Sequence, residues 1–180
     1  MTTETHTYWR TIWLWPCFLL GTYNTIIYEQ FSANIYETSP TLRLLYAIFI
    51  AYLGWDIYVM MFHKQLYRTD LMTHHSMCFV IYSFGLYYNI YKTESLFMLC
   101  ESISLLNYLL RNHKTYLNYY RVFTVVCIRM PIWFGCIYVH YNHYDDLPFT
   151  LFWKYATTLF ILYDIVILYK IKLLMNKRIQ

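Results

Sequence analysis

Long apolar segments separated by short polar turns run along the whole chain. A membrane-spanning helix needs about 20 mainly apolar residues, and six segments reach or approach that length. This pattern predicts an all-α integral membrane protein, built as a bundle of about six transmembrane helices. The expected helices cover residues 8–28, 41–62, 70–91, 93–110, 119–138 and 149–169.

The composition agrees with this class. Hydrophobic residues make up 59% of the chain and charged residues 13%, against about 45–50% and about 25% in soluble domains. Six helices leave little chain for a soluble region, so residues 1–180 are predicted to form one transmembrane domain. The net charge of +4 is scattered, which argues against nucleic-acid binding. The five cysteines all lie in apolar segments and are expected to pack as small apolar side chains.

The positions of lysine and arginine predict the orientation. Six helices would place both termini and the second and fourth turns on the same side of the membrane. The positive-inside rule then places that side, with both termini, in the cytoplasm. The basic residues expected there are Arg10, Lys64, Arg68, Arg111, Lys114, Arg121, Lys170, Lys172, Lys177 and Arg178.

Two adjacent histidines, His74 and His75, open the third predicted helix. At helical spacing Asp70, His74 and Cys78 fall on one stripe, while His75 points about 100° away. An imidazole can exchange a proton near neutral pH, so the pair could act as a general base or as metal ligands. Alternatively, both rings could simply form hydrogen bonds near a helix end.

A metal site is the weaker of these alternatives. Asp70, His74 and Cys78 would need a further ligand from another helix, such as Cys100 or Glu101. The chain contains no known close-spaced metal-binding motif, so no metal is predicted.

Four charged residues fall at membrane depth. At a rise of about 1.5 Å per residue, Asp56 and Asp164 lie about 9 Å from the cytoplasmic ends of their predicted helices, and Glu101 and Arg129 about 15 Å. Charges inside a membrane are costly unless they are paired or hydrated, so one polar chamber open to the cytoplasm is predicted. Arg129 is expected to pair with Glu101, as either a functional or a structural ion pair.

The order of these polar landmarks resembles the TLC-domain family, which includes ceramide synthases and TRAM-type translocon proteins. The resemblance covers about residues 46–172 and is closer to the small TLC-domain proteins than to classical ceramide synthases. Cys100 stands where ceramide synthases have histidine, and Ser104 where they have a second aspartate. The landmarks are Gly54-Trp55-Asp56, Asp70 with His74-His75, Glu101 through Asn107, Arg129 before a proline, and Phe152-Trp153-Lys154.

The resemblance implies a function in lipid metabolism at the endoplasmic reticulum membrane. An intramembrane histidine pair would transfer an acyl group from acyl-CoA to a lipid amine or hydroxyl, with acyl-CoA as co-substrate and no bound cofactor. The alternative is a non-catalytic protein that binds lipid or cargo and regulates membrane lipid composition or trafficking. The expected catalytic residues are His74, His75, Glu101 and Asp70, and the expected substrate-binding residues are Asp56, Asn107 and Arg129.

Overall fold

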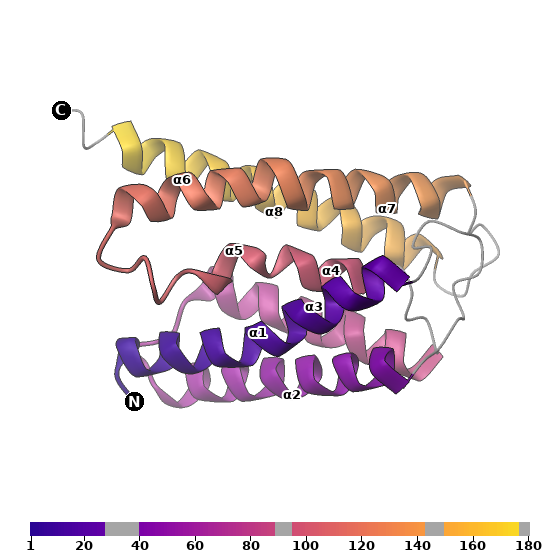
Figure 1. The fold of residues 1–180 in the computed structure, drawn as a ribbon, viewed down its shortest axis with the longest axis horizontal. Helices are drawn as coiled ribbons and strands as arrows, with labels where there is room; N and C mark the ends of the chain where they lie inside the picture. The colour runs from indigo at the N-terminus through magenta and orange to yellow at the C-terminus, as the bar shows by residue number, and fades with distance from the viewer. Residues whose placement is uncertain (28–39, 89–94, 143–149, 177–180) are drawn as a thin grey trace. The chain divides into compact units, whose positions relative to one another are not determined.

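The computed structural model describes residues 1–27, 40–88, 95–142 and 150–176, and regular structure in these ranges is entirely helical (Figure 1). This confirms the all-α prediction. The predicted helix ends at residues 28, 91, 93 and 149 lie outside the described residues. The elements are α1 Thr3–Ile27, α2 Pro40–Phe62, α3 Thr69–Tyr88, α4 Ser95–Cys100, α5 Ser102–Leu105, α6 Lys114–Thr124, the π-helix η1 Val125–Arg129, α7 Met130–Asn142 and α8 Thr150–Asn176.

These elements make six helical segments, because one residue separates α4 from α5 and α6 continues through η1 into α7. Two of the segments, Pro40–Phe62 and Lys114–Tyr138, are long and apolar enough to cross a membrane. The chain divides into two compact units. Unit 1 contains α1 to α5, and unit 2 contains α6, η1, α7 and α8.

Helix α1 begins five residues before the predicted start. Thr2 caps it, since its Oγ1 accepts a hydrogen bond from the Thr5 N–H at 3.1 Å. Glu4 in the first turn places a negative charge at the positive end of the helix dipole. His6 and Arg10 therefore stand one turn apart on α1 rather than in or beside a polar tail.

Unit 1 has an aromatic core. Helix α1 packs against α2 and against α4 and α5, and α2 packs against α3. The Tyr82 ring of α3 meets two rings of α2, with centroids 4.7 Å from Phe49 and 5.2 Å from Tyr46. All three side chains are buried. Large aromatic contacts of this kind fix the rotation of α3 against α2, and that rotation positions the histidine pair.

The fourth predicted helix breaks at Glu101. The Glu101 N–H bonds to the Met98 carbonyl at 3.2 Å, and the Ser104 N–H bonds to the Glu101 carbonyl at 2.9 Å. These bonds join residues three apart, which is the 3₁₀ pattern and tighter than an α-helix. The break separates α4 from α5 and leaves Glu101 buried at the junction.

In unit 2, five residues of π-helix join α6 to α7. Pro131 follows closely and has no N–H to donate to the preceding turn. The widened turn carries Arg129, whose side chain is buried. Helix α8 packs against α6 and α7.

Helix α8 continues seven residues beyond its predicted end, to Asn176. The sequence there looks like a basic tail, yet Ile171 is buried while Lys170 and Lys172 are exposed. The apolar face of α8 therefore persists past residue 169, and the lysines occupy its outer side.

Candidate functional site

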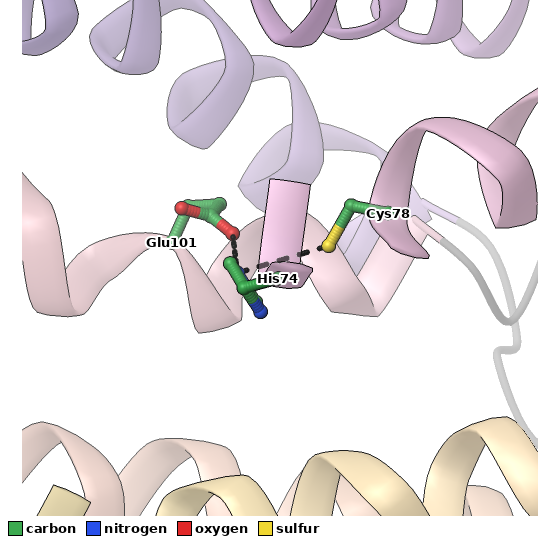
Figure 2. A group of neighbouring side chains, drawn as sticks. All are labelled: His74, Cys78 and Glu101. Atoms are coloured by element: carbon green, nitrogen blue, oxygen red, sulfur yellow. Dashed lines mark hydrogen bonds and ion pairs between the residues drawn. The ribbon is translucent and has the colours of Figure 1, made fainter. Parts of the chain in front are cut away.

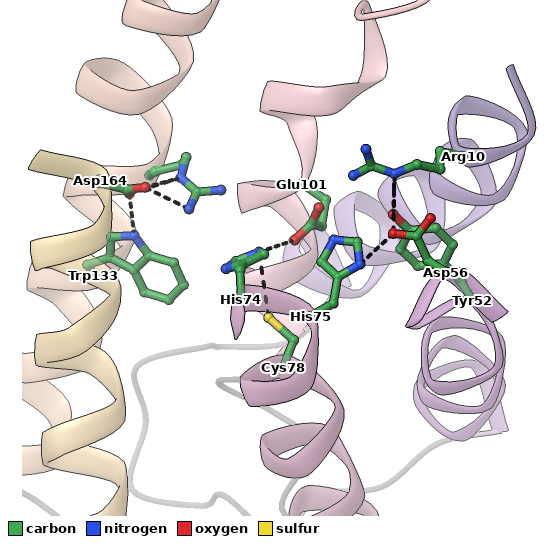
Figure 3. Close-up of polar contacts among 10 residues, drawn as sticks. Arg10, Tyr52, Asp56, His74, His75, Cys78, Glu101, Trp133 and Asp164 are labelled. Atoms are coloured by element: carbon green, nitrogen blue, oxygen red, sulfur yellow. Dashed lines mark hydrogen bonds and ion pairs between the residues drawn. The ribbon is translucent and has the colours of Figure 1, made fainter. Parts of the chain in front are cut away.

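Asp56 is the centre of a buried polar cluster in unit 1. Its Oδ1 lies 2.6 Å from His6 Nε2, and its Oδ2 lies 2.7 Å from His75 Nδ1 and 3.5 Å from Arg10 Nε. Helices α1, α2 and α3 each contribute to this group, as Figure 3 shows for Arg10, Asp56 and His75. The Asp56 side chain is 0% exposed, so these three partners replace water around the carboxylate.

Charge balance in this cluster depends on Arg10. Arginine stays protonated in proteins, so Arg10 offsets the single negative charge of Asp56. Arg10 Nε also donates a hydrogen bond to the Tyr52 hydroxyl at 3.3 Å. Arg10 therefore leaves no uncompensated negative charge on Asp56. Because Nδ1 of His75 faces the carboxylate, Nε2 lies on the opposite side of the ring.

His74, Cys78 and Glu101 make a second polar group, shown in Figure 2. His74 Nε2 lies 3.5 Å from Glu101 Oε1 and 3.7 Å from Cys78 Sγ. His74 and Cys78 are one turn apart on α3, and the break between α4 and α5 supplies Glu101. All three residues are buried, with 8%, 4% and 6% of their surfaces exposed. One metal ion could be held by this group, because an imidazole nitrogen, a thiol sulfur and a carboxylate oxygen all lie within 4.8 Å of one another.

The histidine pair thus connects two different sets of partners. Consecutive helical residues point about 100° apart, and the two rings have centroids 5.5 Å apart. His75 faces Asp56 on α2, whereas His74 faces Glu101. The sequence predicted this divergence, and the structure identifies the partner of each ring.

Asp70 pairs with Arg68 at the start of α3. Its carboxylate accepts hydrogen bonds from Arg68 at 2.8 and 3.3 Å, and a third of the side chain is exposed. Of the predicted stripe, His74 and Cys78 come together. The contact described for Asp70 is with Arg68 at the start of α3, where its charge also complements the helix dipole.

Arg129 pairs with Asp164 inside unit 2, and its predicted pairing with Glu101 of unit 1 stays a prediction. In unit 2 its Nε donates to both carboxylate oxygens of Asp164 at 2.9 Å, and its Nη2 lies 2.7 Å from Oδ1. The predicted sixth helix ended seven residues too early, at residue 169. The predicted depth of Asp164 from the cytoplasmic helix end was therefore smaller than that of Arg129. Along the observed helices, Asp164 lies about 18 Å from Asn176 and Arg129 about 22 Å from Lys114.

Trp133 completes the Asp164 environment. Its indole Nε1–H donates to Asp164 Oδ2 at 2.8 Å, and its ring stacks on Phe160 with centroids 4.9 Å apart. Figure 3 shows the indole N–H directed at the Asp164 carboxylate. Asp164 thus receives donors from α7 as well as from the π-helix.

Three residues of the unit 1 site were not predicted to belong to it. His6 and Arg10 were missed because α1 was expected to begin at residue 8, so their shared helix face was not considered. Tyr52 was missed because it is one of 22 tyrosines and residue type alone does not single it out. It stands four residues before Asp56, on the same helix face. Asn107, a predicted substrate-binding residue, lies after α5, where its N–H bonds to the Ser104 carbonyl at 3.1 Å.

The chain was compared with known proteins by sequence and by structure. No family model, curated protein or solved structure matches it.

Proposed function

We propose that the chain is a membrane enzyme of lipid metabolism that transfers an acyl group from acyl-CoA to a lipid amine or hydroxyl. The observation that carries this proposal is the contact of 2.7 Å between Asp56 Oδ2 and His75 Nδ1 inside unit 1. A carboxylate at one ring nitrogen orients an imidazole and leaves the other nitrogen to take a proton from a substrate. His75 is therefore the proposed general base, and Asp56 its positioning residue.

The proposed enzyme has six transmembrane helices in the endoplasmic reticulum membrane, with both termini in the cytoplasm. The two long apolar helices support membrane association. So do the large apolar side chains that the helices leave exposed, since lipid tails would cover them. On α8 these include Leu159, Leu162, Ile165, Val166 and Leu173.

The proposed reaction requires one proton to move. His75 Nε2 takes a proton from the lipid amine or hydroxyl as its nitrogen or oxygen attacks the thioester carbonyl of acyl-CoA. An amide or ester bond forms, the carbon–sulfur bond breaks, and the CoA sulfur leaves with the proton that His75 returns. His74 contacts Glu101 and stands beside His75, so these two residues can bind the polar part of a substrate.

The resemblance to TLC-domain proteins favours the same chemistry, and the aspartate of Gly54-Trp55-Asp56 is the residue that faces His75. The competing hypothesis is a non-catalytic protein that binds lipid or cargo. In that case the buried polar groups only hold α1, α2 and α3 together, as buried networks can do without any chemistry.

A lipid profile separates the two hypotheses. Membranes expressing the wild type, a His75→Ala variant or a His74→Ala/His75→Ala variant would be supplied with isotope-labelled acyl-CoA at matched protein levels. We expect one labelled lipid class to form with the wild type and to fall about 100- to 10,000-fold in both variants, which is the usual contribution of a general base.

His113→Ala is the matched control, because His113 is an exposed imidazole at the start of α6. It should form product as the wild type does. Identical lipid profiles for wild type and double variant, with all proteins folded, would reject the enzyme and favour the binding protein.

A further inference from the structure

We infer that His74, Cys78 and Glu101 form a Zn²⁺ site with one coordination position left for a water molecule or a substrate oxygen. This inference goes beyond acyl transfer and does not depend on it. Zn²⁺ binds imidazole nitrogen, thiolate sulfur and carboxylate oxygen, and catalytic zinc sites typically have three protein ligands and one exchangeable ligand. The three side chains provide one ligand of each kind.

The two separations from the His74 nitrogen match a coordination tetrahedron, and all three ligand atoms lie within 4.8 Å of one another. With zinc bonds of about 2.0–2.1 Å to nitrogen, about 2.0–2.2 Å to oxygen and about 2.3 Å to sulfur, neighbouring ligand atoms lie about 3.4 Å (N to O) and about 3.6 Å (N to S) apart. His74 Nε2 lies 3.5 Å from Glu101 Oε1 and 3.7 Å from Cys78 Sγ. The nitrogen–oxygen separation is longer than that of an ordinary N–H···O hydrogen bond, which is about 2.7–3.2 Å.

The charges also favour a divalent cation. As metal ligands, a Cys78 thiolate and a Glu101 carboxylate would supply two negative charges, and a neutral His74 would supply none. Zn²⁺ would make the group neutral.

The local structure holds the three ligands from two directions. His74 and Cys78 project from one face of α3 with i, i+4 spacing, which is the spacing that lets two helical side chains bind one metal ion. Glu101 comes from the 3₁₀ break between α4 and α5, and its side chain points toward His74 (Figure 2). The His75 ring stands beside this group, with its centroid 5.5 Å from that of His74.

Metal analysis of the purified full chain tests the site. After incubation with Zn²⁺ in detergent and removal of excess metal, we expect about one zinc ion per wild-type chain. His74→Ala, Cys78→Ser and Glu101→Gln should each bind zinc at least about tenfold more weakly. Three variants matched in side-chain type should retain the metal: His113→Ala, Cys17→Ser and Asp70→Asn.

Cobalt substitution identifies the sulfur ligand. Titration of the wild type with Co²⁺ should produce a thiolate-to-cobalt charge-transfer band that reaches its maximum at one equivalent. Cys78→Ser should lack the band and Cys17→Ser should keep it, with circular dichroism showing both variants folded. A folded wild type that gives no band and retains no zinc would overturn the site. A different metal at one per chain would overturn the assignment to zinc, and an unchanged band in Cys78→Ser would overturn the ligand set.

Discussion

Asp56 in unit 1 and Asp164 in unit 2 are both completely buried aspartates, yet their surroundings differ in one respect. Asp164 is held by the Arg129 guanidinium and the Trp133 indole N–H, and neither group releases its proton near neutral pH. Asp56 is held by Arg10 and by the imidazoles of His6 and His75, the side-chain type that most often serves as a general acid or base. Both units therefore bury a charged aspartate. The groups that contact the carboxylate distinguish the candidate site at Asp56 from the structural ion pair at Asp164.

The largest expected effect comes from exchanging each aspartate for asparagine. Asp56→Asn replaces the carboxylate that orients His75 with an amide, and product formation should fall about 100- to 10,000-fold. Asp164→Asn should leave product formation per mole of folded protein unchanged, because it alters only the unit 2 pair. The labelled acyl-CoA assay measures both variants, and equal losses would show that the two aspartates have the same role.

A smaller effect is expected from removing the unit 2 cation. Arg129→Ala leaves the Asp164 charge buried without its main partner, so the free energy of unfolding should fall by about 3–5 kcal/mol. Denaturant unfolding in detergent measures this change. The double variant Arg129→Met/Asp164→Leu should recover much of the loss, since it removes both charges. If the double variant loses as much as the single one, the ion pair is not what makes Arg129→Ala unstable.

Lys154→Ala is the control for that experiment. Lys154 lies over the Tyr141 ring, with Nζ 4.5 Å from its centroid. A single contact of this type is worth only about 0.5–1 kcal/mol at exposed sites. The free energy of unfolding should therefore fall far less in Lys154→Ala than in Arg129→Ala.

The smallest effect is expected at the start of α3. Arg68 pairs with Asp70, but 62% of the Arg68 side chain is exposed to solvent. Exposed ion pairs contribute about 0.2–1 kcal/mol, so Arg68→Ala should lower the free energy of unfolding by no more than that. The loss should also shrink as salt is raised, because salt screens exposed charges. A loss comparable to that of Arg129→Ala would mean that Arg68 has a buried role.

The sequence predicted the helices well because long apolar runs leave few alternatives to a helix. It also predicted that His74 and His75 face different directions, since helical geometry alone fixes the angle between neighbours. Helix ends were less predictable. The first turn of α1 depends on the Thr2 cap, and the last turns of α8 depend on Ile171 staying buried between exposed lysines.

Contacts between helices were the least predictable part of the site. Depth along a helix suggested Glu101 for Arg129 and did not point to Asp164, because the contact with Asp164 depends on which helix faces which and where each one ends. The pairing of Asp56 with His75 likewise depends on packing of α2 against α3, which the Tyr46, Phe49 and Tyr82 rings set.

The π-helix at residues 125–129 changes the direction in which the side chains of α7 point, relative to those of α6, around the helix axis. A π turn closes its hydrogen bonds over five residues instead of four, which amounts to one inserted residue in the helical repeat. Each residue of an α-helix advances about 100°, so the faces of α6 and α7 are out of phase by roughly that angle. A helical wheel drawn through residues 114–142 without this offset assigns Trp133 and its neighbours to the wrong face. Substitutions in α6 and in α7 should therefore be planned on two separate helical wheels, one for each side of the π-helix.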